Sequence, residues 1–373
     1  MDKILYIHGG GDAIGGIETY LARSLKYHKI FKPYIGIVKK GRFFKYLQNE
    51  NFKNIIDLKG GRLRELPKTL NAIYNCIKFI KKNDIKLIIA HGAHSFVFAG
   101  IISKISNIKS IFYVHVDIKK EEFRSLITGI AFRIKPTLYI ANSEFTAKSV
   151  KKFLKSDAKI NYPASDIHKF DSINEFNAKR KLREEFGIPE DKIIFSIIGR
   201  IQEWKGQDVG ILAFKNMKNK DKACLLIVGE CTFKKDEKYY EYLKKLSKEE
   251  KWIIFTGFRN DVPFIMKGSD IILHTSRNPE PFGIVIVEGM MAKKPVLASA
   301  SGGPIEIIEN GKDGFLYEPG NYKSLCKIMD MLIENENLRQ EIGIKGYEKA
   351  KNKFTMEASI SNLEEILKEL LKK

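Results

Sequence analysis

The sequence has little of what marks a secreted, membrane-spanning or disordered protein. It contains only four cysteines, with no C-x-x-C pair among them, so neither a disulfide framework nor a cysteine zinc site is expected. It has no run near the roughly 18 uninterrupted apolar residues of a membrane-spanning helix. Residues 3–7 form a strand-like segment where a secretory signal peptide would stand. We therefore expect a cytoplasmic protein whose cysteines are reduced and packed.

The length and apolar pattern predict two α/β domains. The 373 residues are 44% hydrophobic and 29% charged, as in globular proteins of about two domains. Strand-like runs alternate with helical patterns such as 66–82 and 95–105, which indicates parallel sheets with helices on both faces. The expected strands are residues 3–9, 34–38, 54–58, 86–90, 110–114 and 137–141, followed by 193–198, 225–228, 252–256, 271–273 and 295–298. In such sheets, functional side chains gather at the carboxyl ends of strands.

Positive charge is concentrated in the first part of the chain. The formal net charge is +20; residues 1–160 hold 30 Lys+Arg and 12 Asp+Glu, and residues 161–373 hold 35 and 33. A basic surface of this kind favours an anionic partner, either nucleic acid or a membrane. No nucleic-acid-binding module is found, so nucleic acid is not an expected partner. The alternative is a lysine-rich solvated surface without a partner.

Short basic segments in this half are candidates for contact with lipid head groups. Residues 39–44 and 62–64 combine Lys or Arg with Phe or Leu in loop-like regions. Residues 119–135 place apolar residues at helical spacing between basic ends. That pattern suits a membrane-surface helix, but it is commoner in a helix packed on a sheet.

The passage 270–306 organises the second half of the chain. A strand-like run ends in a turn-rich cluster, which is followed by Glu280-Pro281-Phe282-Gly283, an apolar run and a second carboxylate, Glu288. The next strand leads to Gly302-Gly303, ahead of another helical pattern. Two glycines before a helix let the backbone approach a bulky anion at the helix N-terminus.

Two further strand, loop and helix passages have the composition of phosphate sites. Residues 8–16 end in Gly15-Gly16 before a helical pattern, but the strict G-x-G-x-x-G spacing fails, so a dinucleotide cofactor is disfavoured. Later in the chain, Gly199 permits a sharp exit from a strand, and Arg200 and Lys205 place two cations beside a helix N-terminus. This second loop is predicted to bind a diphosphate. The alternative is a pair of surface cations in a loop.

These passages resemble the retaining glycosyltransferases of family 4, the glycosyl transferases group 1. The resemblance rests on Glu280, seven residues, Glu288 and the later Gly302-Gly303 turn, with Gly257-Phe258 and Asp261-Val262 ahead of them. It implies an α/β GT-B fold, with two facing Rossmann-like domains, parallel sheets and a cleft between them. Two departures from the usual family text are His274-Thr275-Ser276, where Pro-Ser is usual, and Lys293-Lys294 in place of a glycine-containing turn.

The resemblance also places the domains. Residues 161–166 are similar to the interdomain passage of the family, so we set the boundary at 165. Residues 1–165 would then form an acceptor-binding domain and residues 166–353 a nucleotide-sugar-binding domain. The amphipathic C-terminal helix, 354–373, would cross back to join the first domain.

A set of site residues follows from the resemblance. The resemblance implies four catalytic residues, Arg200, Lys205, Glu280 and His115. Arg200 and Lys205 would hold the donor pyrophosphate, Glu280 would lie against the transferred sugar, and His115 matches a family histidine that faces that sugar. The alternative for His115 is a loop histidine that caps the following helix. Glu288 would accept hydrogen bonds from ribose hydroxyls. The predicted donor-binding residues are Gly15, Gly16, Gly199, Arg259, Phe282, Gly283, Glu288, Gly302 and Gly303.

No metal or other cofactor is expected. No D-x-D pair stands in a loop where a metal would bind, and His91 and His94 lack a third ligand at metal-binding spacing. Arg200 and Lys205 would replace Mg²⁺ or Mn²⁺ in stabilising the leaving diphosphate. The co-substrate would be a UDP- or GDP-linked sugar. Its transfer would retain configuration, because the acceptor attacks the face that the diphosphate leaves.

The leading hypothesis is a retaining transferase of hexosyl or N-acetylhexosaminyl groups. It would build a cell-envelope polysaccharide on a glycan acceptor, most simply a lipid-linked one, at the inner face of the cell membrane. The basic N-terminal half would attach it there peripherally. The alternatives are a soluble-acceptor transferase or sugar-nucleotide epimerase of the same fold, and a non-catalytic nucleotide-sugar-binding protein. The presence of all four charged site residues argues against a non-catalytic protein, because a degenerate site commonly loses one of them. These residues are Arg200, Lys205, Glu280 and Glu288.

Overall fold

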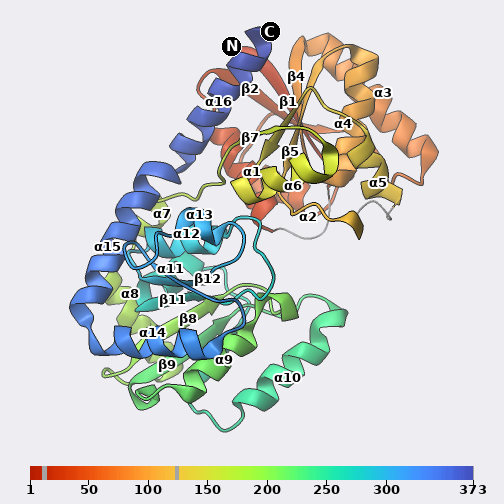
Figure 1. Ribbon diagram of the computed structural model, residues 1–373. Coiled ribbons are helices and arrows are strands. Elements are labelled where there is room, and N and C mark those ends of the chain that lie inside the picture. Colours follow the sequence, from red (N-terminus) through yellow and green to blue (C-terminus); the bar gives the residue numbers. More distant parts are fainter. Residues whose placement is uncertain (11–14, 122–125, 373) are drawn as a thin grey trace. The chain divides into compact units, whose positions relative to one another are not determined.

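The chain divides into two compact units, each built on a parallel sheet (Figure 1). The computed structural model describes residues 1–10, 15–121 and 126–372. Unit 1 comprises Met1–Pro163 and Met356–Lys373, and unit 2 comprises Ala164–Thr355. Residues 11–14 of the predicted glycine loop, and residues 122–125 of the predicted helix at 119–135, lie outside the described residues.

The sheet of unit 1 has seven parallel strands in the order β3-β2-β1-β4-β5-β6-β7. The strands are β1 Asp2–His8, β2 Phe31–Ile37, β3 Ile55–Asp57, β4 Ile85–His91, β5 Lys109–Val114, β6 Leu138–Ala141 and β7 Ala158–Ile160. The central strands carry near-continuous apolar runs, as strands covered on both faces do. The strand order reverses between β1 and β4, so a topological switch point lies at their carboxyl ends.

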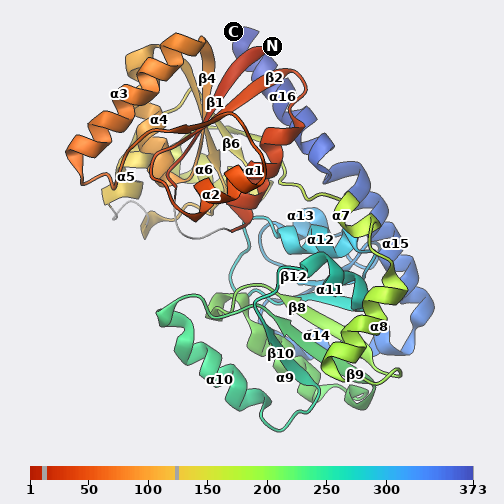
Figure 2. The same cartoon turned by 180° about the vertical axis from the view of Figure 1, so that it is seen from behind.

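Helices cover both faces of this sheet (Figures 1 and 2). They are α1 Gly16–Tyr27, α2 Arg42–Asn49, α3 Leu66–Asn83, α4 Ala93–Ser106, α5 Leu126–Arg133, α6 Glu144–Leu154 and α16 Met356–Lys372. Side chains alternate along a strand, so Leu5 and Ile7 point into the core under α3, α4 and α5. Tyr6 points to the other face, where α1 and α16 contact each other.

The sheet of unit 2 has six parallel strands in the order β10-β9-β8-β11-β12-β13. They are β8 Ile193–Ile198, β9 Ala223–Val228, β10 Ile253–Gly257, β11 Ile271–His274, β12 Val296–Ser299 and β13 Phe315–Tyr317. The order reverses between β8 and β11, which makes the carboxyl ends of these two strands the second switch point.

The helices of unit 2 also form two layers (Figure 2). They are α7 His168–Asp171, α8 Glu175–Phe186, α9 Gln207–Asn216, α10 Glu237–Ser247, α11 Val262–Gly268, α12 Ile284–Met291, α13 Pro304–Ile307, α14 Tyr322–Glu334 and α15 Glu336–Lys353, with short 3₁₀ turns η2 Glu203–Lys205, η3 Lys220–Lys222 and η4 Lys234–Asp236. Phe195 and Ile197 pack with α9 and α14, whereas Ile194 packs with α8 and α11. This alternation along β8 places one core on each side of the sheet.

The predicted α/β fold with two Rossmann-like sheets is confirmed. Every predicted strand occurs within three residues of its expected ends, whereas the short strands β7 and β13 were not predicted. The apolar run 284–287 proves to be the start of helix α12. The unit division falls after Pro163 and Thr355, beside the expected boundaries at 165 and 353. Within the described residues, no helix combines the length and apolar character needed to cross a membrane.

Helix α16 is fastened to unit 1 by a buried carboxylate. Glu364 is only 3% exposed. Its Oε1 accepts hydrogen bonds from the backbone N–H groups of Lys29 (2.8 Å) and Ile30 (2.9 Å), and it lies 3.1 Å from Nδ1 of His28. The opposite nitrogen of that imidazole lies 2.7 Å from the Tyr6 hydroxyl. A residue near the C-terminus therefore completes the hydrogen bonding of the segment between α1 and β2.

We expect Glu364→Ala to lower the free energy of unfolding of unit 1 by about 3 kcal/mol, because two backbone N–H donors and the buried His28 imidazole lose their acceptor. Urea unfolding followed by circular dichroism at pH 7 measures this. Glu365→Ala is the matched control, since its side chain is 63% exposed and, within the part of the chain that the structure describes, pairs only with Lys368. Equal stability of the two variants would show that Glu364 does not anchor the helix.

Candidate functional site

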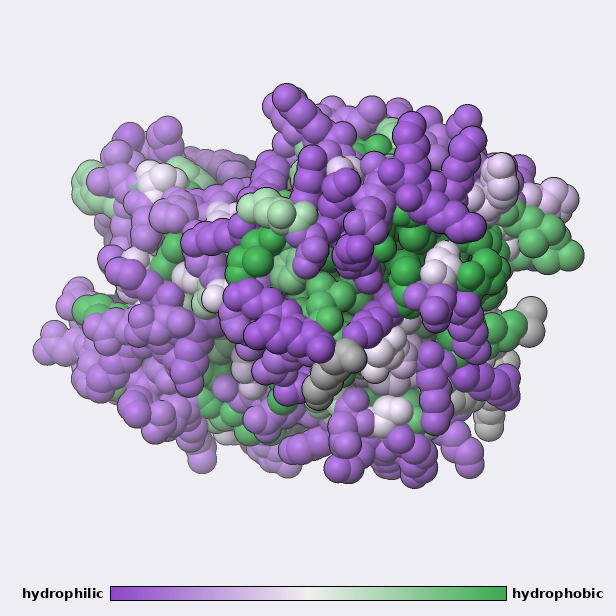
Figure 3. Space-filling model, turned by 90° about the horizontal axis from the view of Figure 1, so that it is seen from above, coloured by the Kyte–Doolittle hydropathy of each residue, from purple (hydrophilic) through white to green (hydrophobic). Residues whose placement is uncertain are grey.

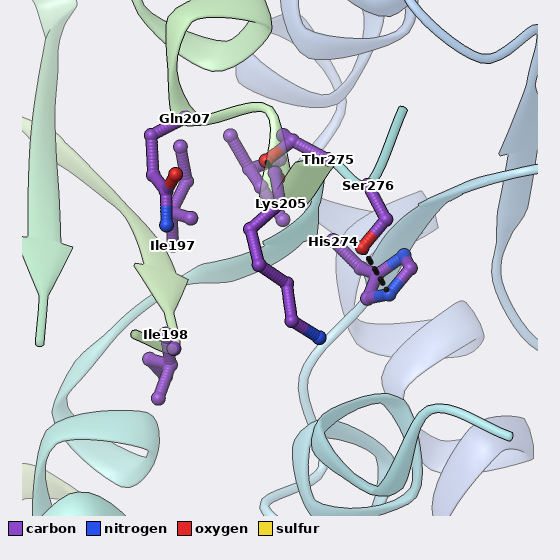
Figure 4. Close-up of a pocket in the computed structure, with 9 residues that line it drawn as sticks. Ile197, Ile198, Lys205, Gln207, His274, Thr275 and Ser276 are labelled. Atoms are coloured by element: carbon purple, nitrogen blue, oxygen red, sulfur yellow. Dashed lines mark hydrogen bonds between the residues drawn. The ribbon is translucent and has the colours of Figure 1, made fainter. Parts of the chain in front are cut away.

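The candidate site of unit 2 lies at the carboxyl ends of β8 and β11 (Figure 4). Lys205 comes from the 3₁₀ turn η2 after β8, and His274 is the last residue of β11. Thr275 and Ser276 follow His274 directly. These residues line one small pocket together with Ile197, Ile198, Gly199, Gln207 and Leu273. The pocket therefore stands at the topological switch point of the sheet, where this class of fold places ligands.

An ion pair joins two of the predicted catalytic residues. Lys205 Nζ lies 2.6 Å from Glu280 Oε2, and the two side chains are 22% and 13% exposed. The loops that carry them touch: Thr275 Oγ1 donates to the Lys205 carbonyl at 2.9 Å. Gly206 has φ +63°, and a Cβ there would stand 2.2 Å from the Thr275 carbonyl oxygen. Glycine is thus required for the close approach that brings the cation to the carboxylate.

Glu280 has further polar partners. His274 Nε2 and Ser276 Oγ each lie 3.2 Å from Glu280 Oε2. Burial by itself raises the pKa of Glu280, but the Lys205 charge and the hydrogen bond from His274 outweigh it and hold that pKa well below its usual range. An ionised carboxylate only accepts hydrogen bonds, so the bond from His274 requires a proton on Nε2.

The predicted glycine pair packs directly on the Glu280 segment. Glu280 and Gly302 form a parallel β-bridge, and the Gly303 N–H donates to the Glu280 carbonyl at 2.8 Å. Gly302 has φ +80°, and a Cβ on Gly303 would stand 2.4 Å from the Cα of Phe282. The two glycines therefore allow backbone to approach backbone, and the Gly303 N–H is already bonded. The Phe282 side chain is buried and packs near the Phe354 ring.

The remaining predicted residues after β8 and β11 are distributed around this centre. Arg200 is exposed, and among the described residues no carboxylate pairs with it; its guanidinium lies 5.7 Å from the Phe233 ring centroid. Gly199 is the exit from β8. Gly283 is the N-cap of α12, and Glu288 on that helix accepts from Ser165 Oγ at 2.8 Å.

Arg259 is held by carboxylates. Its Nε and Nη2 each lie 2.8 Å from Asp261 oxygens, and its guanidinium also bonds to Glu185. The hydrogen bonds to Asp261 and then to Glu185 raise the pKa of Arg259 further. The side chain is therefore already committed within unit 2, and any contact with a nucleotide would compete with these pairs.

The other predicted residues belong to unit 1. Gly15 is the N-cap of α1 and donates its N–H to Glu18 Oε2 at 2.9 Å, while Gly16 opens the helix. The first N–H groups of a helix have no partner inside it, so this end remains suited to an anion. His115 Nε2 lies 2.8 Å from His91 Nδ1. Burial lowers the pKa of His115 to about 3.

Two residues around Glu280 were not assigned a role from the sequence. In the sequence, His274 and Ser276 were noted only as departures from the usual motif of the resembling family, yet both contact the Glu280 carboxylate. The available signal was position: a histidine at the carboxyl end of a buried strand faces the functional edge of a parallel sheet. Among the described residues, no group of three or more His, Cys, Asp or Glu side chains could hold a metal ion.

Comparisons with known proteins place this site in context. The family model of the glycosyl transferases group 1 matches residues 178–349. The alpha-1,3/1,6-mannosyltransferase ALG2 of Dictyostelium discoideum is 26% identical over 295 residues, which cover 72% of this chain and 68% of that protein. The capsular polysaccharide biosynthesis glycosyltransferase CapM of Staphylococcus aureus is 27% identical over 194 residues, covering 52% and 50%. The crystal structure of Anabaena Alr3699/HepE in complex with UDP-glucose aligns with a TM-score of 0.85 and 25% identity over 98% of this chain and 99% of that one.

Removing the cation should change the pH dependence of stability. The folded pKa of Glu280 is lowered, so its ionisation stabilises unit 2 above the unfolded value of 4.5, and this contribution is lost as the pH falls. In Lys205→Met, burial still disfavours the ionised form of Glu280, but the positive charge that mainly stabilises this form is gone. We expect that variant to be less stable by about 2 kcal/mol at pH 7, with a gap that narrows below pH 4.5.

Urea unfolding of unit 2 at pH 7 and at pH 3 measures the gap. Lys312→Met is the matched control, because Lys312 and Glu309 form an exposed pair. This control should change stability little at either pH. If the difference in stability between the wild type and Lys205→Met were the same at both pH values, Lys205 would not be the cause of the lowered Glu280 pKa.

Proposed function

We propose that this chain, whose residues 178–349 match the family model of the glycosyl transferases group 1, catalyses a retaining transfer from a nucleotide sugar. The enzyme moves a hexosyl or N-acetylhexosaminyl group from a UDP- or GDP-linked donor to a hydroxyl of a glycan acceptor. The observation that carries this proposal is the Lys205–Glu280 pair, 2.6 Å apart, at the carboxyl ends of β8 and β11.

In this proposal Arg200 and Lys205 stabilise the leaving diphosphate. Negative charge develops on the β-phosphate as the glycosidic bond breaks, and fixed cations lower the energy of that state. An ammonium group has three N–H donors. Lys205 uses one on Glu280 and keeps the others for phosphate oxygens. The exposed guanidinium of Arg200 supplies a second cation, and the two together do the task of a divalent metal.

In this proposal, Glu280 and Glu288 contact different parts of the nucleotide-sugar donor. Glu280, kept ionised by Lys205 and His274, lies against the sugar, where it accepts from hydroxyls or supports positive charge at the anomeric carbon. Glu288, eight residues later on α12, accepts from the ribose hydroxyls. The acceptor attacks the face that the diphosphate leaves, and a diphosphate oxygen takes the acceptor proton. Configuration is thereby retained.

The comparisons favour one donor base and one kind of product. The Alr3699/HepE structure holds UDP-glucose, so we propose a UDP-linked donor ahead of a GDP-linked one. CapM bears the name of a capsular polysaccharide enzyme, which supports a role in cell-envelope polysaccharide synthesis. We propose a lipid-linked glycan as the acceptor, because residues 1–160 hold 30 Lys+Arg against 12 Asp+Glu, an excess of positive charge that suits an anionic membrane.

Calorimetric titration with EDTA present tests the metal-free diphosphate site. We expect micromolar binding of UDP, with weaker or no binding of GDP and ADP. Lys205→Ala and Arg200→Ala should each weaken binding by about tenfold or more, because each removes a charged hydrogen bond to phosphate. Lys312→Ala, at an exposed pair distant in sequence from the site, should bind as the wild type does. No binding of any of the three nucleotides would refute the proposal.

The membrane part of the proposal rests on one helix of unit 1. Leu66, Leu70 and Tyr74 on α3 are 65%, 65% and 64% exposed, and their spacing of four puts them on one face. The exposed Arg62 and Arg64 precede this helix. On the face seen from above, hydrophilic residues predominate and hydrophobic ones show between them (Figure 3). Apolar side chains beside cations suit the head-group region of an anionic bilayer.

Flotation with vesicles of phosphatidylglycerol and phosphatidylcholine tests this surface. We expect the wild type to bind at low salt and to be released at high salt, because surface charge is screened. Leu66→Ser/Leu70→Ser/Tyr74→Ser should reduce binding by about tenfold or more, since it removes the apolar contacts. Phe176→Ser/Ile344→Ser, at exposed apolar positions of unit 2, is the matched control. Equal binding of both variants would contradict the proposal.

A further inference from the structure

Two histidines on neighbouring strands of unit 1 are bonded to each other. His91 ends β4, and His115 follows β5, which pairs with β4. Nδ1 of His91 lies 2.8 Å from Nε2 of His115. The rings are stacked with centroids 5.0 Å apart, and the Tyr113 ring lies 4.4 Å from that of His115. This packing fixes the planes of both imidazoles, so each ring nitrogen has a defined position.

Both imidazoles are neutral at ordinary pH. Burial lowers the pKa of His115 to about 3 and, together with the proximity of His115 and His8, lowers that of His91 well below its usual range. Glu18 opposes the shift of His115 but does not overcome it. A neutral imidazole carries one proton, and its other nitrogen only accepts. The contact between the rings therefore has one donor and one acceptor.

The second nitrogen of His91 decides which ring donates. His91 is 2% exposed, and its Nε2 is buried with no hydrogen-bond partner among the described residues. A proton on Nε2 would leave an N–H donor buried and unpaired, which folded proteins rarely tolerate. A proton on Nδ1 is bonded to His115, and only a lone pair stays unsatisfied. With the proton on Nδ1, His91 therefore has no unpaired N–H donor.

The consequence for His115 is a fixed tautomer. If Nε2 of His115 accepts from His91, the single proton of His115 must stand on Nδ1. The described residues form no hydrogen bond to that nitrogen, and His115 as a whole residue is partly exposed. The His115 backbone is held as well, since its carbonyl accepts from Asn142 Nδ2 at 3.2 Å.

We propose that His91 is a positioning residue for His115: it donates Nδ1–H and thereby holds His115 as the tautomer that offers Nδ1–H to a ligand oxygen. His115 then donates a hydrogen bond from Nδ1–H to a hydroxyl or ring oxygen of a sugar. It does not act as a base that takes the proton of that hydroxyl. The identity of the ligand as the donor sugar rests on the proposed function. The tautomer itself rests only on the packing of unit 1.

Long-range proton–nitrogen NMR spectra of ¹⁵N-histidine-labelled protein at pH 7 test the tautomer. The signals of His115 are identified by their loss in His115→Gln. We expect the wild type to show His115 protonated on Nδ1 and unprotonated on Nε2. A proton on Nε2 of His115 would overturn the inference, and this test needs no variant of His91.

Two substitutions test the part played by His91. His91→Asn keeps an N–H donor near the position of Nδ1 and should preserve the His115 tautomer. His91→Leu removes the donor and should give a mixture of tautomers, with kcat/KM for sugar transfer lower by about tenfold, as for one lost hydrogen bond. An unchanged His115 tautomer in His91→Leu would overturn the role of His91.

The NMR result and the nucleotide titration can fail separately. The expected tautomer without UDP, GDP or ADP binding would refute the proposed function and leave the histidine pair intact. Nucleotide binding with the other tautomer would refute the pair and leave the function intact. Rescue of kcat/KM in His91→Asn, compared with His91→Leu, separates positioning from a loss of packing, because both variants replace the buried ring.

Discussion

The carboxylate of Glu280 is the constraint around which this edge of unit 2 is arranged. A carboxylate largely removed from water needs a cation and hydrogen-bond donors, or it would take up a proton. Lys205, His274 and Ser276 supply them from three points, namely the turn after β8, the end of β11 and the loop that follows. Parallel strands end at the same edge of a sheet, so residues 75 apart in sequence meet there without distortion of either strand.

Close approach of loops is the second condition, and glycine meets it. Gly206 lies against the loop after β11, and Gly302 and Gly303 lie against the segment that carries Glu280. A second ion pair holds the same region: Arg277 bonds to Asp208, which also accepts from the Tyr239 hydroxyl at 2.8 Å. The Lys205 turn and the Glu280 loop are thus tied to each other at several points. Such ties keep charged groups at fixed separation, which electrostatic stabilisation of a leaving group requires.

Unit 1 handles its polar groups by a different means. Burial keeps the imidazoles of His91 and His115 uncharged by lowering their pKa values, and Tyr20 and Tyr113 are joined through the amide of Asn161. Asn161 Nδ2 lies within 3.3 Å of the oxygens of Tyr20, Tyr113 and Ser359, so one amide connects α1, β5 and α16. The last helix of the chain is consequently part of the unit that contains the first strand. A neutral network suits recognition of uncharged hydroxyl groups, whereas the charged centre of unit 2 suits a diphosphate.

Apolar periodicity and the position of glycines and charges are local properties. They were enough to determine the two parallel sheets, nearly all their strands, and the placing of Lys205 and Glu280 in the loops that follow two strands. Only the tertiary structure decided which groups face each other. Arg259 is engaged by Glu185, 74 residues away, the Gly303 N–H is taken by Glu280, and His91 meets His115 across neighbouring strands. Such contacts join segments far apart in the chain, and they form only where packing is accurate to within a few tenths of an ångström. Residue type and spacing alone do not determine packing to that accuracy.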